Sequence, residues 1–156
     1  MTLDHLVREL AAEPGRWREL VRHTAAERHF ALLTRDDEVE VWVVSWMDGH
    51  DTGFHDHDDS AAAIVVLEGE VEDQRLALGR APRTTRYTAG EAFSVPPAAI
   101  HRVLHAGDRP AVTLHAYSPP LARVGAYEED EDGLLLRHAR AAGEELRPVG
   151  AGRLAA

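Results

Sequence analysis

The segment from residue 49 to residue 60 reads GHDTGFHDHDDS and contains two histidines, His55 and His57, that are separated by one residue. In a β-strand, residues i and i+2 point to the same side of the sheet. If this segment is extended, His55 and His57 can therefore present two imidazoles to one metal ion. The pair alone is weak evidence, because a solvated acidic turn can contain the same residues by chance.

A second segment, residues 90 to 101, reads GEAFSVPPAAIH and strengthens the metal-site interpretation. Pro96 follows Gly90 after five intervening residues, and His101 comes five residues after Pro96. The first segment likewise begins with Gly49, which five intervening residues separate from the histidine pair, and Gly69 comes twelve residues after His57. Together the two segments resemble the bipartite motif of the cupin superfamily, whose fold is a small jelly-roll-like β-barrel with a metal inside its mouth.

The cupin resemblance implies that His55, His57 and His101 are the metal ligands. Most cupins also carry a glutamate ligand five residues after the second histidine, where this chain has Ala62. A neutral three-histidine set leaves more positive charge on the metal and favours an anionic ligand such as a thiolate. Three imidazoles with open positions suit a divalent metal that performs O2 or Lewis-acid chemistry.

A third segment, VTLHAYSPP at residues 112 to 120, resembles a signature of the cysteine dioxygenase family of cupins. In that family the histidine and the tyrosine of the signature line the iron site, which assigns these roles to His115 and Tyr117. On a strand Thr113, His115 and Tyr117 share a face, so their side chains can form a hydrogen-bonded chain. The resemblance extends from about residue 28 to residue 121.

The family resemblance implies a non-haem Fe(II) enzyme that adds both atoms of O2 to the sulfur of a small thiol and yields a sulfinate. Tyr117 would hydrogen-bond the oxygen or the substrate carboxylate at the iron, held in orientation by His115. Mammalian members cross-link this tyrosine to a cysteine, but Ala62 occupies that position here. The alternatives are a cupin metalloenzyme that acts on a carbon substrate and a non-enzymatic cupin that senses a small molecule.

The substrate stays open among cysteine, 3-mercaptopropionate and a histidine-derived thione such as ergothioneine. Cysteine-specific relatives carry an arginine that grips the substrate carboxylate on the strand before the turn. One alignment places Arg35 at this position, whereas another places Phe30 or Ala31 there and leaves Arg35 in a solvated hairpin turn. Phe54, next to the first metal ligand, is a candidate for the wall of the substrate pocket.

The composition of the 156-residue chain excludes several kinds of chemistry. It has no cysteine, and all 17 of its basic residues are arginines, so disulfides, thiolate metal ligands and Schiff-base lysines are absent. A formal net charge of -10 argues against binding to nucleic acid or to an anionic membrane surface. The N-terminal residues lack a signal-peptide pattern. We expect a cytoplasmic monomer or homodimer whose partners are a small thiol and O2.

The pattern of apolar runs and turn residues predicts a mainly β protein, a cupin barrel behind an N-terminal helical segment. We expect one domain over residues 1–156, with a helical cap at 1–27 that Pro14 and Gly15 interrupt, a barrel at 28–121 and a C-terminal extension at 122–156. In the extension we expect a loop at 128–132, an element around 134–140 and a frayed tail over the last dozen residues. The predicted barrel strands are 29–34, 39–46, 61–67, 71–78, 92–95, 102–105 and 112–117.

Overall fold

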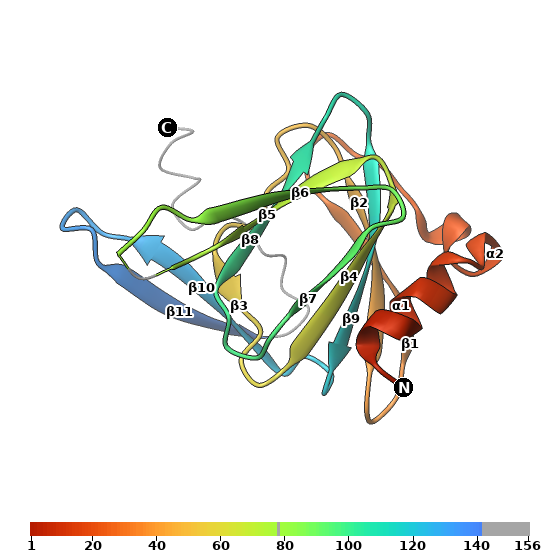
Figure 1. Cartoon of the computed structure of the whole chain (residues 1–156), viewed down its shortest axis with the longest axis horizontal. Helices are drawn as coiled ribbons and strands as arrows, with labels where there is room; N and C mark the ends of the chain where they lie inside the picture. The colour runs from red at the N-terminus through yellow and green to blue at the C-terminus, as the bar shows by residue number, and fades with distance from the viewer. Residues whose placement is uncertain (78, 142–156) are drawn as a thin grey trace.

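Two antiparallel β-sheets face each other in the computed structural model, which describes residues 1–77 and 79–141 (Figure 1). The first sheet has, in spatial order, the strands β1 (His29–Arg35), β2 (Glu40–Trp46), β9 (Ala111–Ser118), β4 (Ala61–Glu68) and β7 (Ala92–Val95). The second sheet has the strands β11 (Leu135–Ala141), β10 (Arg123–Glu129), β3 (His55–Asp56), β8 (His101–Ala106), β5 (Glu70–Arg75) and β6 (Arg83–Thr88).

The central strands of the first sheet are apolar on both faces because both faces are covered. In β4, Ile64 and Val66 pack into the space between the sheets, whereas Ala63 and Val65 pack into a separate apolar layer on the outer face. A strand buried on both sides has no polar face to alternate, which explains the uninterrupted apolar run of this segment.

The N-terminal helices supply the outer layer of the first sheet. Helix α1 (Leu3–Ala11) begins at Thr2, whose hydroxyl accepts a hydrogen bond from the His5 amide at 3.2 Å, and it buries Val7 and Leu10. Helix α2 (Pro14–Trp17) and a short 3-10 helix (Arg18–Leu20) follow, and Trp17 joins the same apolar layer. Figure 1 shows these helices outside the barrel, and α1 lies against β4 and β9. The helical segment is shorter than the predicted 1–27, since it ends at Leu20.

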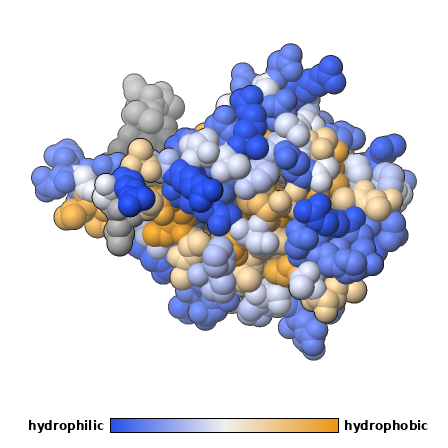
Figure 2. Space-filling model, viewed as in Figure 1, coloured by the Kyte–Doolittle hydropathy of each residue, from blue (hydrophilic) through white to orange (hydrophobic). Residues whose placement is uncertain are grey.

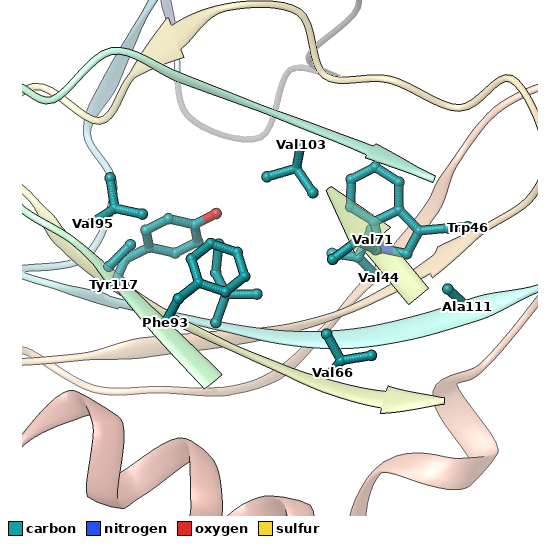
Figure 3. Close-up of a cluster of buried hydrophobic side chains, with 11 residues drawn as sticks. Val44, Trp46, Val66, Val71, Phe93, Val95, Val103, Ala111 and Tyr117 are labelled. Atoms are coloured by element: carbon teal, nitrogen blue, oxygen red, sulfur yellow. The ribbon is translucent and has the colours of Figure 1, made fainter. Parts of the chain in front are cut away.

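The interior of the barrel is filled from both sheets. Val44, Trp46 and Val66 come from the first sheet, and Val71 and Val103 come from the second. The close-up in Figure 3 shows these side chains around a space into which the hydroxyl of Tyr117 points. The inner core therefore leaves room beside Tyr117, one of the site residues predicted from the sequence.

The mainly β architecture with an N-terminal helix is confirmed, and each of the seven predicted strands is present among the described residues. The strands that were not predicted are β3, β6 and β10, whereas β11 is the element expected around 134–140. Strand β10 pairs with β3 and β11 pairs with β10, so residues 123–141 continue the second sheet. Strand β10 runs to Glu129, so it includes the first two residues of the loop predicted at 128–132. Leu78 and the predicted tail lie outside the described residues.

Hydrophilic side chains cover much of the face seen in Figure 2. Hydrophobic ones gather over the middle of the barrel and at the end where the β10–β11 hairpin lies; Leu134, Leu135 and Leu136 of this hairpin are exposed. Within residues 1–77 and 79–141, no helix is long and apolar enough to cross a membrane.

Candidate metal centre

The second sheet brings the three predicted ligand histidines together. His55 lies in β3, His57 follows it after one residue, and His101 begins β8 directly opposite His55 in the β3–β8 pairing. A tight turn follows the histidine pair, in which the Ser60 amide donates to the His57 carbonyl at 3.0 Å. All three imidazoles are buried.

The three imidazoles point their Nε2 atoms at one another. The distance from Nε2 of His57 is 3.1 Å to Nε2 of His55 and 3.3 Å to Nε2 of His101. Two nitrogens that each lie about 2.1 Å from one metal ion, at roughly a right angle, are about 3 Å apart. The spacing of the three donor atoms therefore fits ligands of a single ion.

The hydrogen bonds on the opposite sides of the rings decide which nitrogen carries the proton. Nδ1 of His55 lies 2.9 Å from the Gly53 carbonyl oxygen, and Nδ1 of His101 lies 2.7 Å from Oδ1 of Asp73. Both partners are acceptors, so each Nδ1 donates a proton and each Nε2 presents a lone pair. These two lone pairs are directed towards the space beside Nε2 of His57, where a cation would be attracted to them. The donor set therefore fits a metal ion.

Burial keeps these histidines in the form that binds metal. Loss of solvation lowers the pKa of His55 to about 4. Burial and the neighbouring histidines hold the pKa of His57 and of His101 well below the usual value of 6.5. At neutral pH the three imidazoles are neutral, as ligation requires.

Asp73 positions His101, a role that the sequence interpretation missed. Its carboxyl group is 2% exposed and also accepts a hydrogen bond from Nε of Arg75 at 2.9 Å. Burial raises the pKa of Asp73, and the Arg75 guanidinium opposes this shift. The sequence did contain a signal for Asp73, because alternation along β5 puts it on the same face of the strand as the buried Val71.

A hydrogen-bonded chain runs along the inner face of the first sheet towards the histidines. Nε1 of Trp46 donates to Oγ1 of Thr113 at 2.9 Å, and that hydroxyl lies 2.8 Å from Nε2 of His115. Nδ1 of His115 lies 3.1 Å from the Tyr117 hydroxyl, and the ring of Tyr117 is 5.0 Å from the ring of His57. Thr113, His115 and Tyr117 are the side chains for which the sequence predicts a shared face of one strand.

The indole of Trp46 can only donate, which favours one direction for the whole chain. Thr113 then donates its own hydrogen to His115, and Nδ1–H of His115 donates to Tyr117. Burial lowers the pKa of His115 to about 3 and raises that of Tyr117, so both stay neutral at neutral pH. With this direction, the Tyr117 hydroxyl keeps a proton that it can donate into the barrel.

A cavity of about 90 Å³ opens beside the metal centre. Its walls are formed by Arg28, Phe30, Glu40, Trp42, Val44, Trp46, Thr52, His55, His101, Val103, His115, Tyr117 and Leu121. Arg28 is 7% exposed, and its guanidinium lies 5.4 Å from the centre of the Trp46 ring and donates to the Asp51 carbonyl at 2.6 Å. The sequence interpretation missed Arg28, although it stands two residues before Phe30 on the inward face.

The two residues predicted to contact the substrate, Arg35 and Phe54, lie outside the cavity. Arg35 is the last residue of β1, and its half-exposed guanidinium Nε is 3.5 Å from Oε2 of Glu40. This place corresponds to the alignment that leaves Arg35 beside the hairpin turn. The ring of Phe54 faces the guanidinium of Arg102 at 5.7 Å. Neither Arg35 nor Phe54 is among the residues that line the cavity.

Comparison with known proteins gives one matching family model and several relatives. The model for "Cysteine dioxygenase type I" matches residues 3–130. The chain is 29% identical over 97 residues to cysteine dioxygenase type 1 of Danio rerio, an alignment that covers 56% of this chain and 48% of the relative. The protein of the same name from Rattus norvegicus is 28% identical over the same length, with the same coverage. The chain thus spans about half the length of these curated relatives.

Solved structures resemble the fold. A protein with a double-stranded β-helix domain from Klebsiella pneumoniae superposes with a TM-score of 0.58 at 22% identity, covering 65% of this chain and 80% of that chain. A cupin superfamily protein from Desulfitobacterium hafniense gives a TM-score of 0.56 at 16% identity, covering 66% of this chain and 87% of that chain. At these identities the likeness concerns the arrangement of the strands, which is that of the cupin double-stranded β-helix.

Proposed function

The chain belongs to the cysteine dioxygenase type I family of cupins, and on this premise we propose that it is a non-haem Fe(II) thiol dioxygenase. The reaction takes one thiol and one O2 to one sulfinic acid: both oxygen atoms are bonded to sulfur, and the thiol proton passes to the product or to solvent. The observation that carries the proposal is the three-histidine centre, which opens on a cavity that contains a tyrosine and an arginine.

Iron(II) held by His55, His57 and His101 would supply the redox chemistry and attract a thiolate. Because the three imidazoles are neutral, the protein ligands do not offset the positive charge, and this favours an anionic sulfur. No carboxylate stands at the place of Ala62 to compete with the substrate.

Two residues of the chain would orient the substrate. Arg28 presents a buried guanidinium to the cavity, and guanidinium groups bind carboxylates in two-point geometry. Tyr117 offers the hydroxyl proton that His115 and Thr113 leave available. Apolar walls such as Val44 and Val103 limit the water that reaches the reacting groups. These features favour a small thiol that carries a carboxylate.

The decisive experiment measures O2 consumption by the Fe(II)-loaded protein with L-cysteine, 3-mercaptopropionate, cysteamine and ergothioneine, and identifies the sulfinate by mass spectrometry. We expect faster turnover of the small thiols that bear a carboxylate than of cysteamine, and no turnover by His57→Ala, which loses a ligand. A protein that binds no iron, or that leaves all four thiols unoxidised, would contradict the proposal.

The role of Arg28 is tested with the same panel. In Arg28→Gln we expect kcat/KM for thiols with a carboxylate to fall by about 10–100-fold, because a buried charge partner is lost. Oxidation of cysteamine, which has no carboxylate, stays within about twofold of wild type, as expected for a loss confined to that contact. The matched variant Arg35→Gln removes an arginine outside the cavity and should not change the dependence on a carboxylate. If Arg35→Gln lowered kcat/KM for thiols with a carboxylate and Arg28→Gln did not, Arg35 would be the residue that binds the carboxylate.

A further inference from the structure

The cavity contains a buried carboxylate that the proposed reaction does not use. Glu40 begins β2, is 2% exposed and lines the cavity together with Trp42, which lies on the same face of the strand. In the pairing of β2 with β9, Glu40 is directly opposite Tyr117. Side chains at such opposite positions start about 5 Å apart on one face of the sheet, and both Glu40 and Tyr117 line the cavity.

The described contacts of Glu40 leave it capacity for a further partner. Its Oε1 accepts a hydrogen bond from the Leu121 amide at 3.1 Å, and its Oε2 is 3.5 Å from Nε of Arg35, longer than an ordinary hydrogen bond. A carboxylate has about four positions at which it can accept a hydrogen. The ion pair with the half-exposed Arg35 offsets only part of the cost of burying this charge beside a cavity. A donor from a bound molecule would therefore be favourable here.

The surroundings of Glu40 suit a cation. Phe30 and Trp42, whose ring centres are 5.8 Å apart in an edge-to-face arrangement, line the same cavity. Positive groups are attracted to the faces of such rings. The charge of Glu40 also contributes to the raised pKa of Tyr117, whereas Arg28 acts in the opposite direction. Glu40 and Arg28, which carry opposite charges, thus both influence the Tyr117 hydroxyl.

Building on the proposed thiol dioxygenase function, we propose that Glu40 binds a positively charged nitrogen of the substrate and so selects thiols that carry one. Arg28 and Glu40 then recognise opposite charges of one molecule. A thiol with both an ammonium and a carboxylate offers a partner to both residues, whereas 3-mercaptopropionate offers no cation to Glu40 and cysteamine offers no carboxylate to Arg28.

The test measures equilibrium binding without turnover. The Fe(II)-loaded protein is titrated without O2 with L-cysteine, cysteamine and 3-mercaptopropionate, in wild type and in Glu40→Gln. Glutamine keeps the size of the side chain and an acceptor for the Leu121 amide but removes the charge. We expect Kd for the two thiols that carry nitrogen to rise by about tenfold or more, and Kd for 3-mercaptopropionate to change by less than about twofold.

Two further variants separate recognition from structural effects. Glu38→Gln makes the same charge change at an exposed position two residues away and should leave all three affinities within about twofold, as expected of a screened surface charge. Glu40→Asp keeps the charge but withdraws it from the cavity, and it should weaken binding of the nitrogen-bearing thiols selectively. This variant also decides the matter if Glu40→Gln does not fold.

Each result decides between the two proposals. Equal weakening of all three thiols, or no weakening, would overturn the role of Glu40 even if wild type oxidises thiols. Failure of wild type to bind either nitrogen-bearing thiol would overturn it as well. A selective loss of binding in a protein that consumes no O2 would support Glu40 as a cation site and would refute the dioxygenase function.

Discussion

At the scale of single residues, the metal centre depends on a carboxylate that does not face the metal. Asp73 accepts the Nδ1 proton of His101, and Arg75 holds Asp73 in place. This contact fixes the ring orientation and increases the basicity of the nitrogen that faces the centre. We therefore expect the affinity for metal to depend on a residue outside the three histidines.

For Asp73→Asn we expect metal affinity to fall by about 10–100-fold, because the acceptor of His101 loses its charge. Competition with a chelator of known affinity measures the change. Glu72→Gln is the matched control, since Glu72 is the neighbouring acidic residue and pairs with Arg86 at the surface. Unchanged affinity in Asp73→Asn would show that the carboxylate does not tune the ligand.

At the scale of elements, the two faces of the first sheet have different roles: the outer face contributes to stability and the inner face carries the site. One face of β2, β4 and β9 belongs to the apolar layer that the N-terminal helices cover, and the other face carries the cavity side chains Trp46, His115 and Tyr117. The helix layer can therefore be changed without contact to the residues that line the cavity.

For Leu10→Ala we expect the free energy of unfolding to fall by about 2–5 kcal/mol, because Leu10 is 3% exposed and its removal leaves a void under α1. Urea denaturation measures this loss, and the metal content of the folded variant should equal that of wild type. Glu9→Ala, at an exposed position of the same helix, should stay within about 0.5 kcal/mol. A lower metal content in Leu10→Ala would mean that the helix layer and the site are coupled.

At the scale of the whole molecule, burial of neutral histidines between the two sheets makes stability depend on pH. The pKa of His55 is lowered to about 4 and that of His115 to about 3, and those of His57 and His101 are lowered as well. Below the ordinary pKa of 6.5 the unfolded chain binds protons that the folded protein does not. Stability is therefore complete above that pH and declines as the pH falls towards 4.

The metal-free protein should accordingly lose stability between about pH 6.5 and pH 4, by about 1.4 kcal/mol per pH unit for each buried histidine. Asp73, whose pKa is raised, opposes this trend, but it is one group against four. Asp56, whose pKa is lowered to about 2, contributes mainly below this range. Urea denaturation with a chelator at pH 7.5, 6 and 5 measures the effect; a flat profile would contradict it.

The sequence allowed the ligand histidines and the apolar strands to be predicted for local reasons. His55 lies in the short strand β3 and His57 follows after one residue, and glycines and prolines mark the turns around the two motif segments. Strands β6 and β10 were harder to predict because they carry charged residues at several positions. Such strands are stabilised by pairing with neighbours more than by their own apolar pattern.

The sequence by itself determined the β-rich fold and the shared face of His115 and Tyr117 from spacing along single strands, and it indicated the three-histidine set through its resemblance to the cupin motif. Only the tertiary structure decided which distant side chains meet. Arg28 and Glu40 lie in the cavity, and Arg35 does not, because the pairing of β1, β2 and β9 fixes their positions. Alternation tells which face a side chain occupies, but strand register sets its neighbours across the sheet.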